Sequence, residues 1–244
     1  YQDVYTSEVL AALGSLSRFN LEQKELMDKR MQRRITRIRA SQSPTFLDPE
    51  SVIPRTNIRV ADAREGRFRG SDIPADLQRQ WIQGTGPAAK PKASLKNSIR
   101  NVAYAMLSGA DGWMFDGEDA LGQVQSMSLD NQRNLKLAIH RDPVFLEVAE
   151  QVASQMNGWS AEFLGREIVP DWGKQLDFTT VIFRARGLHL DDRHIRDEKG
   201  VAMSASIVDM VLYVVNNRRQ LQNAGASIVL YLPKIQTAEE AAFW

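Results

Sequence analysis

The sequence predicts an α/β fold in which helices cover a parallel β-sheet. Three short apolar runs, at residues 112–115, 179–183 and 227–232, are rich in β-branched and aromatic residues, which is typical of strands. The runs are continuously apolar, as expected for strands buried on both faces. Amphipathic helical patterns separate them, and this alternation favours a parallel sheet with crossover helices.

Helical periodicity accounts for most of the chain between the predicted strands. The spacing of apolar residues predicts helices over residues 94–107, 131–157 and 206–221. Pro143 marks a break or a first turn within the second of these segments. After the third, Gly225 is a suitable stop, and Thr237 is a suitable N-cap for a last helix over residues 238–244.

The first forty residues predict two further helices. We expect the second to begin at Asn20 as N-cap, with Gln23 completing a capping box. Its outer face is rich in basic residues, namely Lys24, Lys29, Arg30, Arg33, Arg34, Arg37 and Arg39. Such a run is either a phosphate-binding surface or a solvated helix face. Because acidic residues interrupt it, we favour the solvated face.

Residues 41–92 are rich in proline, which disfavours long regular elements. Their apolar content is nevertheless too high for a disordered linker. We therefore expect an ordered, loop-rich connection with one short strand near residues 58–60. This divides the chain into an N-terminal helical and loop-rich region, residues 1–92, and a sheet-containing region, residues 93–244.

Composition limits the classes of function. The formal net charge is +1, which gives no reason to expect nucleic acid or an anionic membrane as a partner. No cysteine is present, which excludes disulfides, zinc–thiolate sites and thiol nucleophiles, and we expect a cytoplasmic location. No apolar run approaches the length of a membrane span. The chain begins at Tyr1 without an initiator Met, so we expect it to be part of a longer protein.

Charged residues follow each predicted strand at its carboxyl end. Asp116, Glu118 and Asp119 follow the first strand, Arg184 and Arg186 the second, and Lys234 the third. Ligands of α/β sheets bind at this edge. Carboxylates on one loop could hold Mg²⁺ directly or through waters, and arginines could grip a carboxylate or stabilise an enolate oxygen. Alternatively, a structural salt bridge could join Asp116 and Arg184.

The three histidines give weaker signals. His189 and His194 flank a short acidic segment, which allows a metal site, but no strong ligand spacing is present and a polar loop is the better interpretation. His140 falls on a predicted helix and is expected to be structural or exposed. The sequence contains no P-loop, no dinucleotide-binding glycine-rich turn and no Gly-x-Ser-x-Gly elbow.

Five segments, in order along the chain, resemble motifs of the malate synthase family, in particular its shorter, A-type form. They are FRGSDIPADL at residues 68–77, IQGTGP at 82–87, GWMFDGEDA at 112–120, RARGLHL at 184–190 and YLPK at 231–234. The resemblance implies the first part of a (β/α)8 TIM barrel, with about three barrel strands in residues 93–244. It also implies a Mg²⁺-dependent condensation of acetyl-CoA with glyoxylate, which gives malate and CoA.

Carried over by position, the resemblance makes Arg184 the catalytic arginine. It places Glu118, Asp119 and Asp116 beside the Mg²⁺, in its outer shell. With these assignments, we expect Arg186 and Lys234 to bind substrate. The direct metal ligands and the catalytic base of the family are expected beyond residue 244, so the chain resembles only the N-terminal half of the enzyme.

One departure from the family pattern leaves other functions open. The family motif Ala-Asp-Phe-Glu-Asp is Phe-Asp-Gly-Glu-Asp at residues 115–119, which changes the shape of the pocket. One alternative is an acyl-CoA lyase or aldolase similar to the citrate lyase β-subunit. Another is a non-catalytic half-barrel that acts as a scaffold. Neither the oligomeric state nor the acetyl-CoA contacts follow from the sequence.

Overall fold

The centre of the molecule is a parallel sheet, seen in a computed structural model that describes residues 1–54, 56–85, 93–118 and 126–244. Within the described residues, its four strands lie in the order β1-β2-β3-β6. Their bounds are β1 Trp81–Thr85, β2 Gly112–Asp116, β3 Thr180–Arg184 and β6 Leu230–Tyr231. All three pairings are parallel, which confirms the predicted type of sheet.

Strand β1 was not predicted, since residues 41–92 were expected to be loop-rich. Its sequence, Trp-Ile-Gln-Gly-Thr, is short and carries a glycine and a glutamine, which weaken the strand pattern. Gly84 is required by close packing: a Cβ there would lie 2.1 Å from the Nε1 atom of Trp113. The division of the chain near residue 92 stays a prediction, and β1 precedes that point while pairing with β2.

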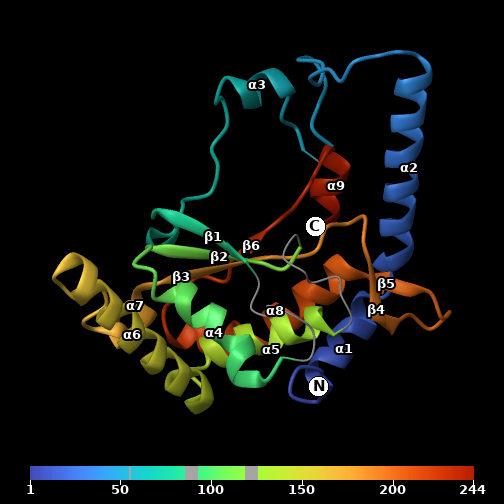
Figure 1. The fold of residues 1–244 in the computed structure, drawn as a ribbon. Coiled ribbons are helices and arrows are strands. Elements are labelled where there is room, and N and C mark those ends of the chain that lie inside the picture. The colour runs from blue at the N-terminus through green and yellow to red at the C-terminus, as the bar shows by residue number, and fades with distance from the viewer. Residues whose placement is uncertain (55, 86–92, 119–125) are drawn as a thin grey trace.

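Helices cover one face of the sheet (Figure 1). They are α4 Leu95–Met106, α5 Met127–Ile139, α6 Pro143–Leu164, α7 Trp172–Phe178 and α8 Ala205–Asn223. Between these helices and the sheet, the aromatic rings of Trp113, Phe115, Phe183 and Tyr213 form a continuous row of edge-on and tilted contacts, with neighbouring centroids 5.1–5.7 Å apart. All four side chains are fully buried, so this row of rings is the centre of the core.

The predicted helices match these elements. Residues 131–157 fall on two helices, α5 and α6, and Pro143 opens the second, which confirms the break or first turn predicted at this residue. The short helix α7 was not predicted. Of the strand predicted at residues 227–232, only β6 pairs in the sheet.

The N-terminal segment forms α1 Ser7–Leu16 and α2 Phe19–Arg39, which confirms two helices. The predicted N-cap at Asn20 is wrong, because α2 begins one residue earlier and Asn20 lies inside it, buried. Its amide donates to the Ala202 carbonyl oxygen over 3.2 Å and accepts from the Ser204 N–H over 2.8 Å. Gln23 donates to the Leu188 carbonyl oxygen. Long-range hydrogen bonds have taken the place of the local capping box.

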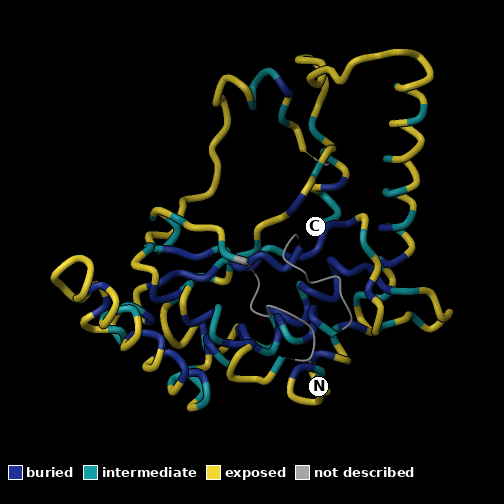
Figure 2. Tube along the Cα trace, in the orientation of Figure 1, coloured by how far each residue is buried: buried dark blue, intermediate teal, exposed yellow. Residues whose placement is uncertain are grey.

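Two smaller features complete the fold. Strands β4 Asp191–Arg196 and β5 Ala202–Ser204 form an antiparallel hairpin where a polar loop was expected. The described residues from 41 to 72 extend away from the sheet, are largely exposed and carry α3 Val60–Arg64 (Figure 2). The 3₁₀ helix η1 Ala75–Leu77 lies against the sheet, where Thr180 Oγ1 donates to the Asp76 carbonyl oxygen over 2.9 Å. The strand predicted at residues 58–60 is reduced to one bridge between Val52 and Arg59.

The last helix, α9 Ala238–Phe243, has Thr237 as its N-cap, as predicted. It lies beside α2, where Phe243 packs edge-on against Phe19 with ring centroids 6.3 Å apart. None of the helices in the described part of the chain has the length and apolar character to cross a membrane.

Candidate active site at the carboxyl ends of the strands

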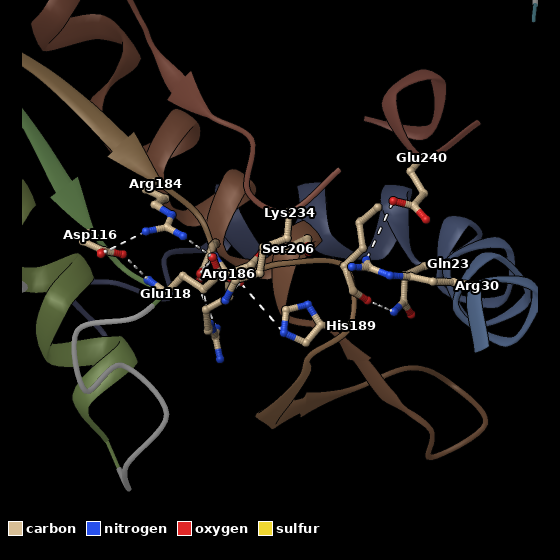
Figure 3. Close-up of polar contacts among 12 residues, drawn as sticks. Gln23, Arg30, Asp116, Glu118, Arg184, Arg186, His189, Ser206, Lys234 and Glu240 are labelled. Atoms are coloured by element: carbon tan, nitrogen blue, oxygen red, sulfur yellow. Dashed lines mark hydrogen bonds and ion pairs between the residues drawn. The ribbon is translucent and has the colours of Figure 1, made fainter. Parts of the chain in front are cut away.

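Arg184 is the centre of a cluster of charged side chains at the carboxyl edge of the sheet (Figure 3). It is the last residue of β3, and the strand register places it beside Asp116, the last residue of β2. Its Nη1 atom lies 3.1 Å from Asp116 Oδ2, and its Nη2 atom lies 2.9 Å from Glu118 Oε2. Both carboxylates are almost completely buried. The sequence correctly predicted that these residues meet.

Neighbouring groups fix the two carboxylates. Gln83 on β1 donates to Asp116 Oδ2 over 2.8 Å. The Glu118 N–H donates to Asp116 Oδ1 over 3.0 Å, so Asp116 also shapes the loop that carries Glu118. Three adjacent strands therefore hold the orientation of the Arg184 guanidinium.

The altered motif at residues 115–119 has a structural reason at Gly117. Its N–H donates to the Arg184 carbonyl oxygen over 2.9 Å. A Cβ at this position would lie 2.8 Å from that oxygen and 2.8 Å from the Phe183 ring. Phe115 meanwhile packs into the core against Phe183. The packing around these positions is therefore compatible with an aromatic residue at 115 and with glycine at 117.

Two further side chains, the ammonium of Lys234 and the imidazole of His189, approach Glu118. Lys234 follows β6, and its Nζ atom lies 3.2 Å from Glu118 Oε1; its backbone is left-handed, with φ of 53°. His189 Nε2 lies 3.9 Å from the same oxygen. That oxygen is buried and, among the described residues, makes no hydrogen bond of good geometry. The Lys234 ammonium therefore holds this oxygen electrostatically.

Arg186 lies in a separate buried cluster. Its Nη2 atom lies 2.7 Å from Asp192 Oδ2 and 2.7 Å from Asp209 Oδ1, and its Nε and N–H both donate to Asp209 Oδ2 over 2.9 Å. Burial acts to lower the pKa of Arg186, but the two carboxylates outweigh it and raise that pKa. These contacts do not support the expected role in substrate binding, which stays a prediction.

The remaining predicted residues divide into three groups. Asp119 lies outside the described residues. His140 is exposed, with Nε2 3.0 Å from the Asn216 carbonyl oxygen, and the His194 N–H donates to Asp192 over 2.7 Å; neither joins the cluster. His189 does approach Glu118, although the sequence favoured a polar loop over a metal site for this residue. Its position just after the charged end of a strand was the available signal.

The cluster fits an outer-shell role toward Mg²⁺. Across the described residues, no three His, Asp or Glu side chains gather closely enough to hold a metal ion. Asp116 and Glu118 offer carboxylate oxygens, the donors that Mg²⁺ and its waters prefer. Because Arg184 already engages both, they suit hydrogen bonding to metal-bound waters better than direct ligation.

A parallel sheet with helices on one face and charged side chains at its carboxyl edge defines the α/β class that includes (β/α)-barrel enzymes. Residues 180–244 match the family described as malate synthase, TIM barrel domain. Similar proteins include the malate synthases of Dictyostelium discoideum (30% identical over 244 residues) and Streptomyces clavuligerus (28% over 243). Malate synthase A of Escherichia coli is 28% identical over 196 residues.

These alignments cover 100%, 99% and 80% of the chain, respectively. The chain is thus similar to malate synthases along its whole length, as the sequence motifs indicated. It spans 38% of the length of the first two relatives and 30% of the third.

Proposed function

We propose that this chain supplies part of the active site of a malate synthase. That enzyme joins acetyl-CoA to glyoxylate and releases malate and CoA. The observation that carries the proposal is the Arg184 guanidinium, fixed by Asp116 and Glu118 at the carboxyl edge of the sheet. An arginine held in this way is preorganised, because its partners fix its plane before any substrate arrives.

Arg184 would act on the oxygen where negative charge develops. Removal of a methyl proton from acetyl-CoA leaves an enolate, and a guanidinium stabilises its oxygen through two parallel N–H donors. Its Nη atoms are engaged by separate carboxylates, but each Nη atom carries a second N–H donor and the side chain is 11% exposed. A lysine would supply the charge without the planar fork.

The acidic residues would serve the metal. We assign Asp116 and Glu118, together with Asp119, to the waters around a Mg²⁺ ion. When bound, that ion would polarise the aldehyde of glyoxylate. Since the relatives are longer than this chain, the proposal assigns the direct metal ligands and the catalytic base to parts of the protein outside residues 1–244.

Lys234 completes the proposed site. Its ammonium lies beside Glu118 and would attract the carboxylate of glyoxylate. The alternatives, an acyl-CoA lyase and a scaffold, have no observation of their own in their favour. A place in the glyoxylate cycle and a cytoplasmic location are parts of the proposal that follow from the expected activity and from the lack of cysteine.

The test measures release of free CoA thiol by the protein that carries this sequence, with acetyl-CoA, glyoxylate and Mg²⁺. Residues 1–244 contain no cysteine and add no thiol background. We expect release only when all three components are present. Arg184→Lys should abolish most of it, whereas Arg219→Lys, at an exposed site on α8, should not. Release that persists without glyoxylate would instead indicate a thioesterase and overturn the proposal.

A further inference from the structure

An arginine-lined pocket lies between α2 and the segments around His189 and Gln236. Its volume is about 430 Å³, and four arginines of α2 contribute to its wall. These are Arg30, Arg33, Arg34 and Arg37, with Met27 and Met31 beside them. The basic run that the sequence suggested was a solvated face therefore encloses a cavity along part of its length.

The lining of this pocket carries excess positive charge. Among the described residues, one carboxylate approaches it: Glu240 on α9 is buried, with Oε2 3.8 Å from Arg30 Nη1 and Oε1 3.6 Å from Arg33 Nη2. Across the residues that the structure describes, no ion pair involves Arg34 or Arg37. Several guanidinium groups that converge with so few carboxylates favour an anionic ligand.

The pocket is held in place by polar contacts at the start of α2. Gln23 donates to the carbonyl oxygen of Leu188, and Lys24 pairs with Asp191. Helix α2 is thereby fixed against the segment that carries His189, which lines the pocket and also approaches Glu118 (Figure 3). The arginines are thus presented from a helix whose start is fixed beside the candidate active site.

We propose that this pocket binds an anion carrying two phosphoryl groups. Guanidinium groups bind phosphate oxygens through paired N–H donors, and consecutive turns of α2 present several such groups on one side. Met27 and Met31 offer an apolar wall for an organic group attached to the phosphates. The diphosphate belongs either to acetyl-CoA, which rests on the proposed function, or to a separate organic diphosphate.

The first experiment titrates inorganic pyrophosphate into the protein and measures binding by calorimetry. We expect pyrophosphate to bind more tightly than sulfate, and the affinity to fall as salt is raised. The double variant Arg34→Gln/Arg37→Gln should weaken binding by about tenfold or more, since two charge-assisted donors are lost. Arg39→Gln removes one positive charge from an exposed site on α2 outside the pocket lining and should change the affinity less than about twofold.

Equal binding of sulfate and pyrophosphate, or equal losses in the double variant and in Arg39→Gln, would overturn the proposal. Circular dichroism spectra of both variants serve as the control that they are folded. Binding is read without turnover, so a protein inactive in the thiol assay that still binds pyrophosphate through Arg34 and Arg37 refutes only the proposed function.

Competition then identifies the source of the diphosphate. If the substrate supplies it, acetyl-CoA should displace pyrophosphate, whereas acetyl-pantetheine, which lacks phosphates, should not. If a separate ligand supplies it, acetyl-CoA and pyrophosphate should bind together, and ADP should compete with pyrophosphate alone.

Discussion

Arg184 and Arg186 lie two residues apart at the end of β3, and each is held by two carboxylates, yet their surroundings differ. Arg186 uses its Nε, its Nη2 and its backbone N–H on Asp209 and Asp192, and it is 3% exposed. Arg184 places one Nη atom on each of its partners and adjoins a cluster with Lys234 and His189 around Glu118.

The difference shows what each cluster can do. Around Arg186, the carboxylates come from α8 and from the β4–β5 hairpin, so the arginine joins the sheet to both. A buried charge that is fully paired in this way stabilises one arrangement of the chain. Around Arg184, the partners come from the edge of the sheet where ligands of this class of fold bind. We therefore expect substitutions at the first cluster to reduce stability and those at the second to reduce activity.

The largest expected effect is on turnover. Arg184→Lys should lower kcat about 1000-fold, because an ammonium cannot reproduce the two donors of the guanidinium. Thiol release from acetyl-CoA measures this, and an unchanged circular dichroism spectrum shows that the fold is retained. Turnover close to that of the parent protein would remove Arg184 from the mechanism and end the contrast between the two arginines.

The second effect is on stability. Asp209→Asn should lower the free energy of unfolding by about 3 kcal/mol, since it leaves a buried guanidinium with a single carboxylate. Urea denaturation measures the change. Asp177→Asn is the matched control, because Asp177 is exposed and pairs with Arg141 over 3.4 Å, and it should cost less than about 1 kcal/mol. Equal losses of unfolding free energy in the two variants would show that burial of the Arg186 cluster does not increase its contribution to stability.

Gly117→Ala should have a smaller effect, and it should reduce both stability and turnover. The added methyl group would press on the Arg184 carbonyl oxygen and the Phe183 ring, which should cost about 2 kcal/mol and displace Arg184. Gly158→Ala, at an open position within α6, is expected to stabilise the protein by up to about 1 kcal/mol. A lower melting temperature for Gly117→Ala and a higher one for Gly158→Ala would confirm the close packing at Gly117. A stable, fully active Gly117→Ala variant would contradict it.

The sequence predicted the elements that depend on local patterns. Strands β2 and β3 are continuous apolar runs, and α4 and α8 have clear helical periodicity, so their positions followed from spacing alone. The positions of strand β1 and of the β4–β5 hairpin did not follow from spacing, because a glycine interrupts the strand pattern in β1 and charged residues interrupt it in β4. Asn20 was misplaced because its partners lie far away in the sequence.

The candidate site, like the fold, was predicted only in part. That Asp116, Glu118 and Arg184 meet follows from the parallel order of the strands, which brings their carboxyl ends together. The separation of Arg184 from Arg186 did not follow. It depends on Asp209, which lies on α8 and is brought to Arg186 by the packing of that helix. No spacing rule connects these positions.

The smallest expected effect concerns Tyr5, which lies near the Arg186 cluster. Burial, followed by the negative charges of Asp192 and Asp209, raises the pKa of Tyr5, and Arg186 opposes the shift. Within the described residues, the hydroxyl makes no hydrogen bond, so Tyr5→Phe should change stability by less than about 1 kcal/mol at neutral pH.

Alkaline pH then separates Tyr5→Phe from the parent protein. A tyrosine with a raised folded-state pKa contributes stability that is fully present below about pH 10 and is lost as the pH rises, because the unfolded chain ionises first. Urea denaturation between pH 9 and 11 should therefore show a steeper loss in the parent than in Tyr5→Phe. Parallel curves would mean that the Tyr5 hydroxyl ionises as readily in the folded protein as in the unfolded chain. Water would then reach the Arg186 cluster. In that case the Arg186 and Arg184 clusters would differ less than their contacts indicate.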